Sequence, residues 1–391
     1  MFDIIIVGAR CAGSSLAIFL GRLGYKVLLI DKISNIGPTL STHIIGEIDI
    51  YKTLNIDKEI NNCGSPILNR LRIDVEGHIF ESDLIVSERA ISVRRELFDT
   101  YLIEEVERTQ NISIQLGFEV TDILADKNGI IVGIEGKTKS NSMKQKFFGK
   151  IVVGADGRNS IISKKTNALT TLKQTEEELS VAYAYLSGVN PLPQGTIEWF
   201  WTKDSIILSN PIDQNMYCIA IMVPPTKFQE ICSHHGFIKK LKHIKTLNPR
   251  INHVDIVGNI KGLKKIDSYM KHPYGEGWVL VGDSSAFLHP ISGVGIDNAV
   301  CTAEYLAYQI DQFLSGKQSW EYSMELYMSF RDERITPQFH SSIKTQQMLK
   351  EPLNDNQNSM TSMICTFPSL AKNIALKSQK IVEMLQEDKD D

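Results

Sequence analysis

The chain has 391 residues, of which 42% are hydrophobic, and its formal net charge is -4. These values indicate a globular protein large enough for two cores, and the absence of a basic stripe argues against nucleic-acid binding. The six cysteines lack metal-ligand spacing, no stretch has membrane-spanning length, and Asp3 stands where a signal peptide would be positive. We therefore expect a cytoplasmic protein with reduced thiols, no metal and no integral membrane segment.

The first 31 residues predict a strand, a tight turn, a helix and a second strand. Residues 4–7 and 27–30 are continuous apolar runs, which are typical of strands buried on both faces of a parallel sheet. Between them, apolar residues recur at helical spacing over residues 14–23. The pattern is that of a βαβ unit that ends in Asp31.

The turn of this unit resembles a dinucleotide-binding fingerprint. Gly8 and Gly13 occupy the first and third glycine positions of Gly-x-Gly-x-x-Gly, and Arg10 replaces the middle one. Unpaired N–H groups at the helix N-terminus attract a pyrophosphate, and Asp31 is placed to accept hydrogen bonds from a ribose. The alternative is a turn whose glycines serve only helix packing.

Residues 32–46 are expected to form a loop, and alternation over residues 67–86 predicts a β-hairpin. Arg94 and Arg95 then precede an amphipathic helix. Cations are disfavoured at a helix N-terminus, so the pair suggests a bound phosphate, and a solvated pair is the alternative.

Residues 112–153 predict an antiparallel meander and a final buried strand, which runs into Gly154-Ala-Asp156-Gly157. Such turns at the carboxyl end of a parallel sheet are where α/β proteins bind ligands. The next stretch predicts an antiparallel sheet with a covering helix, the candidate substrate domain. Its expected strands are 180–188, 195–202, 205–210, 216–223 and 252–258, and its helix is 226–247.

The chain then returns to its first pattern, because an apolar strand ends at Gly282-Asp283 and Pro290 and Gly293 lead into a helix. Helices are also expected over 319–349 and 370–385, with a loop over 351–363. We therefore divide the chain into a first domain (1–178, with 67–90 joining the later sheet), a substrate domain (179–262), a return to the first domain (263–320) and a C-terminal helical region (321–391).

Together the βαβ unit, the Arg94-Arg95 pair and the segments 154–160 and 282–299 resemble the para-hydroxybenzoate hydroxylase-like FAD superfamily, over roughly residues 1–320. That superfamily contains aromatic monooxygenases, geranylgeranyl reductases and flavin-dependent halogenases. The resemblance implies an α/β fold: a Rossmann-type FAD-binding domain (GR2-type) with an inserted antiparallel β-sheet substrate domain and C-terminal helices.

The resemblance also implies FAD contacts. The first turn would face the pyrophosphate, Asp31 the ribose, Asp283 the ribityl hydroxyls, and Pro290 the isoalloxazine. One of Arg94 or Arg95 would face the phosphate or ribityl region, and Arg95 fits the family spacing better. The full expected set is Gly8, Ala9, Arg10, Cys11, Ala12, Gly13, Asp31, Lys32, Arg94, Arg95, Val120, Asp156, Gly157, Asp283, Pro290, Gly293, Val294, Gly295 and Ile296.

The leading functional hypothesis is a monooxygenase that uses NAD(P)H and O2, through a C4a-hydroperoxyflavin, to hydroxylate an aromatic or other electron-rich small molecule. His43 is the catalytic candidate, because its loop should approach the flavin, and His289 is an alternative. The candidate substrate residues are Tyr183, Tyr185, Trp199 and Trp201.

Two other hypotheses stay open. Gly282-Asp-Ser-Ser-Ala286 stands where hydroxylases usually carry Gly-Asp-Ala-Ala-His. Ala286 with Phe287 is closer to the reductase and halogenase versions, which favours a geranylgeranyl-reductase-like double-bond reductase. The halogenase signature Trp-x-Trp-x-Ile-Pro is absent, since Trp199-Phe-Trp201 continues as Thr-Lys-Asp. The third hypothesis is a flavoprotein that acts on a protein partner.

Overall fold

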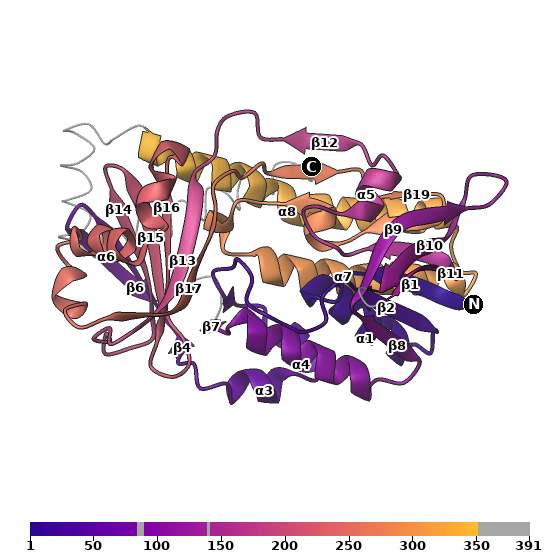
Figure 1. The fold of residues 1–391 in the computed structure, drawn as a ribbon, viewed down its shortest axis with the longest axis horizontal. Helices are drawn as coiled ribbons and strands as arrows, with labels where there is room; N and C mark the ends of the chain where they lie inside the picture. The colour runs from indigo at the N-terminus through magenta and orange to yellow at the C-terminus, as the bar shows by residue number, and fades with distance from the viewer. Residues whose placement is uncertain (84–89, 139–140, 351–391) are drawn as a thin grey trace, which may run out of the picture. The chain divides into compact units, whose positions relative to one another are not determined.

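The computed structural model describes residues 1–83, 90–138 and 141–350, so the loop and helix expected beyond residue 350 lie outside the described residues. The chain forms two compact units (Figure 1). Unit 1 comprises Met1–Ser65, Ala90–Glu178 and Lys265–Thr345. The described part of unit 2 comprises residues 66–83, 179–264 and 346–350.

Unit 1 is built on a sheet in the order β19-β20-β11-β1-β2-β8, which is parallel except for β19. The predicted βαβ unit is its centre, because α1 (Cys11–Arg22) joins β1 to β2. The strands are β1 (Phe2–Val7), β2 (Val27–Asp31), β8 (Ile112–Leu116), β11 (Asn141–Gly154), β19 (Tyr274–Gly275) and β20 (Trp278–Leu280).

Alternate residues of these strands enter two different cores. Ile4 and Ile6 of β1 pack with α1, α4 (Arg95–Arg108) and α7 (Gly295–Leu314). Ile5 and Val7 pack on the other face, against Phe118 and other residues of the β9–β10 hairpin. Because successive strand side chains point to opposite faces, a continuous apolar run is needed to fill both cores.

The remaining elements of unit 1 are short, apart from α8, of which residues 346–350 belong to unit 2. They include an antiparallel pair of β3 with β7 and a three-stranded sheet in the order β12-β18-β21. These elements are β3 (Ile44–Ile45), α2 (Ile48–Thr53), α3 (Asp57–Asn61), β7 (Ala90–Ser92), β9 (Phe118–Ala125), β10 (Ile131–Thr138), α5 (Ile161–Lys165), β12 (Thr170–Lys173), β18 (Tyr269–Lys271), η3 (Gly282–Ser284), β21 (Ala286–Phe287), η4 (Pro290–Ser292) and α8 (Trp320–Lys350). None of the helices in the described residues is both long and apolar enough to span a bilayer.

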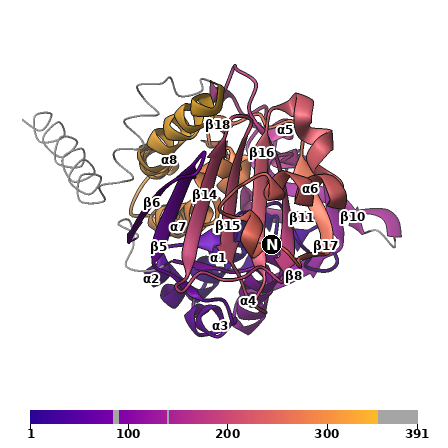
Figure 2. The same ribbon diagram turned by 90° about the vertical axis from the view of Figure 1, so that its left-hand side faces the viewer.

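Unit 2 is a seven-stranded sheet in the order β17-β13-β16-β15-β14-β5-β6, antiparallel except for the β14–β5 pair. Figure 2 shows β5, β14, β15 and β16 side by side. One face packs on η1 and α6, chiefly against Phe237 and Leu241. The elements are β4 (Ile67–Leu68), β5 (Arg70–Val75), β6 (His78–Asp83), β13 (Ser180–Ser187), β14 (Thr196–Thr202), β15 (Ser205–Pro211), β16 (Tyr217–Val223), η1 (Pro225–Ile231), α6 (His234–Lys242), η2 (Asn248–Arg250) and β17 (Asp255–Leu263).

The single long helix predicted over 226–247 is wrong. The segment forms η1, the nine-residue α6 and, beyond it, the short η2. Ser233 separates η1 from α6, because its side chain accepts a hydrogen bond from the Gly236 N–H and caps a new helix. The sheet is antiparallel as expected, apart from the β14–β5 pair, which is parallel.

Candidate functional site

A cavity of about 650 Å³ lies in unit 1, where β1, β2 and β11 reach their carboxyl ends. Segments far apart in the sequence line it together. The expected residues in its wall are Gly8, Arg10, Cys11, Ala12, Asp31, Lys32, Arg95, Val120, Asp156, Gly157, Asp283, Pro290, Gly293, Gly295 and Ile296.

The other expected residues lie beside the cavity without lining it. Ala9 is fully buried and donates its N–H to the Asp31 carboxylate at 2.7 Å. Gly13 is buried inside α1, and Val294 is the N-cap of α7. Arg94 lies within 3.6 Å of the Glu96 carboxylate. These positions support the wall, and direct contact with a ligand remains a prediction for them.

Gly8 shapes the turn that brings α1 to the cavity. Its φ is +111°, which L side chains rarely adopt, and a Cβ there would lie 2.3 Å from the Ala155 carbonyl oxygen. Gly293 and Gly295 differ, since a Cβ on either would meet no atom within 4 Å. Gly8 is therefore required by both its φ and its close contact, Gly293 has a φ of +68° that favours glycine without any clash, and only Gly295 is free of both constraints.

Two helices begin at this cavity. Neither Arg10, the N-cap of α1, nor Val294, the N-cap of α7, makes a side-chain capping hydrogen bond. The first N–H groups of a helix have no partner within it, and the helix dipole places positive charge there. Both helix ends are therefore suited to binding anionic groups or carbonyl oxygens.

Four carboxylate residues line the cavity: Asp31, Glu119, Asp156 and Asp283. The Asp31 carboxylate accepts hydrogen bonds from the Ala9 and Ile33 N–H groups, at 2.7 and 2.9 Å, which fix its orientation. Asp156 accepts from the Ile161 N–H, while its Oδ1 is buried and has no partner among the described residues. Burial raises the pKa of both Asp156 and Asp283 above the ordinary value.

Sequence reasoning missed part of the lining. Arg158 and Asn159 belong to the segment we singled out at 154–160, and residues 39–42 immediately precede His43, so those motifs contained a signal. No sequence signal marked Phe118 and Glu119. The missed residues are Val7, Ile33, Thr39, Leu40, Ser41, Thr42, Phe118, Glu119, Ala155, Arg158, Asn159, Ile161, Lys164, Phe287, Leu288, Ser292 and Ala299.

The two candidate histidines lie behind the wall. His43 is fully buried and is not among the lining residues. Burial, followed by the positive charges of Arg95 and Arg94, lowers the pKa of His43 to about 3, so its imidazole is neutral at ordinary pH. His289 accepts a hydrogen bond from the Ile291 N–H through Nδ1 at 3.1 Å, which stabilises the turn at Pro290.

The four candidate substrate residues share one face of the sheet in unit 2. Side chains alternate along a strand, and the intervening Ala184 of β13 and Phe200 of β14 pack in the core beneath α6. The opposite face therefore carries Tyr183, Tyr185, Trp199 and Trp201. The rings of Tyr183 and Tyr185 lie 5.6 Å apart.

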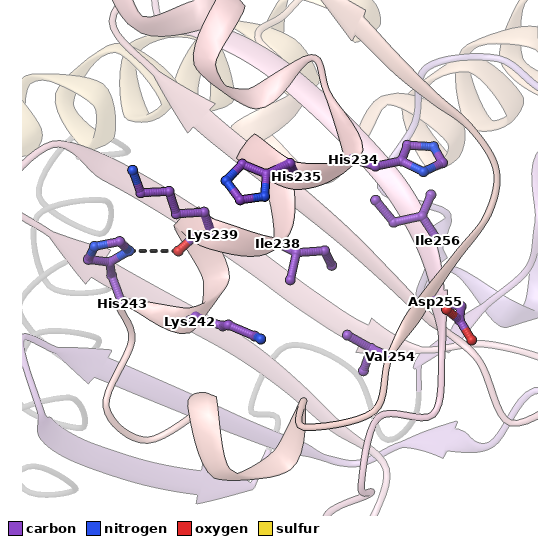
Figure 3. Close-up of a pocket in the computed structure, with 9 residues that line it drawn as sticks. All are labelled: His234, His235, Ile238, Lys239, Lys242, His243, Val254, Asp255 and Ile256. Carbon is purple, nitrogen blue, oxygen red and sulfur yellow. Dashed lines mark hydrogen bonds between the residues drawn. The ribbon is translucent and has the colours of Figure 1, made fainter.

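A second cavity, of about 490 Å³, lies in unit 2 between α6 and the start of β17 (Figure 3). His234 and His235 begin α6 and His243 follows its last residue, and the three imidazoles do not converge in that view. No group of three or more His, Cys, Asp or Glu side chains in the described ranges could hold a metal ion. We therefore place the candidate functional site in unit 1.

The residues of the unit 1 cavity fit a flavin dinucleotide. Two uncapped helix N-termini suit a pyrophosphate, and Asp31 and Asp283 suit hydroxyl groups. Within the part of the chain that the structure describes, Arg95 Nε and Asp156 Oδ1 are buried without hydrogen-bond partners. Buried polar atoms of native proteins are normally paired, so these two point to a polar ligand.

Comparison with known proteins gives the family. Residues 1–336 match the model of a family described as FAD binding domain. A 1H-pyrrole-2-carbonyl-[peptidyl-carrier protein] brominase of Pseudoalteromonas luteoviolacea is 24% identical over 334 residues, 81% of this chain and 78% of the brominase. Digeranylgeranylglycerophospholipid reductase 1 of Methanococcoides burtonii is 24% identical over 325 residues, 78% of this chain and 73% of the reductase.

Among solved structures, PqsL of Pseudomonas aeruginosa, named a probable FAD-dependent monooxygenase, matches with a TM-score of 0.73 at 16% identity. The match covers 93% of this chain and 99% of that chain. Because the identity is low, this match supports a shared fold and nothing more. The superfamily resemblance, the α/β fold and the FAD cofactor are thereby confirmed, whereas the similar proteins are named for different reactions.

Proposed function

The chain belongs to the FAD binding domain family and is an FAD-dependent oxidoreductase, and we propose that it is an NAD(P)H-dependent monooxygenase acting in the cytoplasm. Its substrate in this proposal is an aromatic or other electron-rich small molecule. FAD, when bound, supplies electron transfer from the nicotinamide and activation of dioxygen. The chain contains one glycine-rich βαβ unit, so the nicotinamide would bind only transiently.

The observation that carries the proposal is the positive charge in the wall of the cavity. The N-terminus of α7 and the Arg95 guanidinium both line the wall, and both favour negative charge on a group held there. An electron-accepting cofactor gains negative charge when it is reduced. Pro290 and Gly293 expose the backbone at this point, so the chain can approach such a cofactor closely.

The sheet of unit 2 supports an aromatic substrate. Trp199 and Tyr183 belong to one cross-strand row, because Trp199 pairs with Leu208, Leu208 with Ala220, and Ala220 with Tyr183. Trp199 and Trp201 are partly exposed on this face and suit stacking with an aromatic ring, whereas Tyr183 and Tyr185 are buried. We propose that this face binds the substrate, and that His43 acts in catalysis by hydrogen bonding as a neutral imidazole, because a pKa of about 3 makes it a weak base.

The proposal is tested by measuring NADH and NADPH oxidation together with O2 uptake by the FAD-loaded protein, using a panel of phenols and aromatic amines. A monooxygenase substrate should accelerate both rates and lower the yield of hydrogen peroxide per O2 consumed. Acceleration of nicotinamide oxidation without O2 uptake would contradict the proposal.

Two alternatives have their own support. Phe287 and Leu288 line the cavity and make that part of the wall apolar, which would suit a double-bond reductase like the archaeal relative. Such a reductase would turn over without O2. The brominase is named for a substrate held on a peptidyl-carrier protein, so a carrier-bound substrate is the second alternative. It would show turnover only with the loaded carrier.

A further inference from the structure

One buried carboxylate holds two arginines at the wall of the FAD cavity. Asp99 of α4 is fully buried. Its Oδ2 accepts a hydrogen bond from Arg10 Nη1 at 2.8 Å, and Arg95 Nη2 donates to Oδ1 at 2.8 Å and to Oδ2 at 3.1 Å. Both arginines line the cavity, whereas Asp99 does not. We call these three residues the arginine–aspartate cluster.

The cluster carries excess positive charge. Two guanidinium groups share one carboxylate, and the neighbouring Cys11 thiol, 3.6 Å from Arg95 Nη2, stays neutral because burial raises its pKa. Asp283 is the acidic group that interacts with Arg95 from η3. The Arg95 Nε is buried without a hydrogen-bond partner among the described residues, so Arg95 retains a donor for a ligand.

Arg10 replaces the middle glycine of the fingerprint without backbone strain. Its φ of -92° and ψ of -168° are extended values that any residue adopts. Its side chain leaves the turn, and Nη1 and Nη2 both lie 3.3 Å from the Gly37 carbonyl oxygen. Arg10 therefore connects the start of α1, the loop before residues 39–42 and Asp99 of α4.

We propose that Arg10 is a positioning residue for FAD: through Asp99 it fixes the orientation of Arg95, and through Gly37 it holds the loop that lines the cavity. In most fingerprints the middle glycine lets the backbone approach the pyrophosphate. Here the arginine contributes to cofactor affinity by ordering its neighbours. The inference rests on the FAD site and does not depend on which reaction follows.

The test is Arg10→Gly, which restores the regular fingerprint. If close approach of the backbone to the pyrophosphate were all that mattered, this variant would bind FAD at least as tightly as the parent. The proposal predicts affinity weaker by about tenfold, the effect of losing one charged hydrogen-bond network. FAD affinity is measured by titrating the apoprotein and following flavin fluorescence, and the thermal midpoint of the apoprotein is recorded alongside.

Arg22→Ala is the matched control. Arg22 also lies on α1 and donates to a buried carboxylate of α4, Glu105, at 2.7 Å, but it does not line the cavity. Its loss should lower the thermal midpoint of the apoprotein while changing FAD affinity less than about twofold, since distant sites act independently. Arg10→Lys should be intermediate, because a single ammonium lacks the fork that reaches both Asp99 and Gly37.

Parental or tighter FAD binding by Arg10→Gly would overturn the inference. So would an equal loss of affinity in Arg22→Ala, because it would show that general destabilisation weakens the site. If Arg10→Gly does not fold as apoprotein, Arg10→Lys decides: parental affinity would show that charge alone matters. Neither O2 nor substrate enters these measurements, so they cannot be confused with failure of the monooxygenase proposal.

Discussion

Individual side chains in the unit 1 cavity differ in how they are held. Asp31 is fixed by two backbone N–H groups, and Arg95 by a buried carboxylate. Asp283 borders the cavity at the start of η3, where burial raises its pKa despite the nearby Arg158 and Arg95. Hydroxyl groups of a ligand would stabilise its charged form, so the state of Asp283 depends on the cofactor.

Asp283→Ala is predicted to lose FAD. Removing an acceptor for ligand hydroxyls should weaken binding about tenfold to a hundredfold, the range expected for hydrogen bonds to charged groups. Flavin released from the purified protein by acid measures the effect. Asp267→Ala is the control, since Asp267 is exposed and its carboxylate lies 3.5 Å from Lys265. Parental flavin content in Asp283→Ala would remove this residue from the site.

His43 should make stability depend on pH. The pKa is about 3 in the folded chain and near 6.5 when unfolded, so the unfolded chain binds more protons between these values. The free energy of unfolding should therefore fall as pH falls from 6.5 towards 3, by up to about 1.4 kcal/mol per pH unit. His43 has a φ of +65°, which asparagine tolerates, so His43→Asn is the variant of choice.

Denaturant titrations at pH 7 and pH 5 should show a smaller loss of stability in His43→Asn than in the parent. Equal losses would show that His43 does not titrate in this range. The variant should also retain FAD, because His43 does not line the cavity, and should lose turnover if the residue acts in catalysis. Unchanged turnover would leave His43 with a structural role only.

At the scale of elements, patterns in the local sequence predicted those helices and strands that local interactions determine. The β1–α1–β2 unit could be predicted because continuous apolar runs and a helical period are explicit in the sequence. The helix over 226–247 could not, because Ser233 ends η1 and caps a new helix inside a period that otherwise continues. Helix caps and prolines fix where helices begin, and here they had more influence than the helical spacing of the apolar residues.

The turn before α1 gives a prediction at this scale. Gly8→Ala should destabilise the apoprotein by about 3 kcal/mol and lower its FAD content, because strain and a backbone clash add together. Gly24→Ala is the matched control: its φ is +92° and a Cβ would meet nothing within 4 Å, so only strain of about 1 kcal/mol applies. Thermal unfolding of both variants separates the contribution of backbone strain from that of the clash with Ala155. Equal destabilisation would show that the contact with Ala155 is unimportant.

At the scale of the whole molecule, the sequence supported the fold class because separated motifs occurred in the right order. It could not show that Phe118, Glu119 and residues 39–42 would line the cavity. Those positions depend on how the β9–β10 hairpin pairs with β11 and on the path of a loop. Neither is encoded by local propensity, and the role of Arg10 also emerged only from its contacts.

The measurement that tests the central proposal most directly is the origin of oxygen in the product. The FAD-loaded protein is incubated under 18O2 with a reduced nicotinamide and an aromatic compound that accelerates nicotinamide oxidation and O2 uptake. The product is analysed by mass spectrometry. A monooxygenase should place one 18O atom in each product molecule and form no product under anaerobic conditions. Product formed without O2 and without label would contradict the proposal and would favour the double-bond reductase.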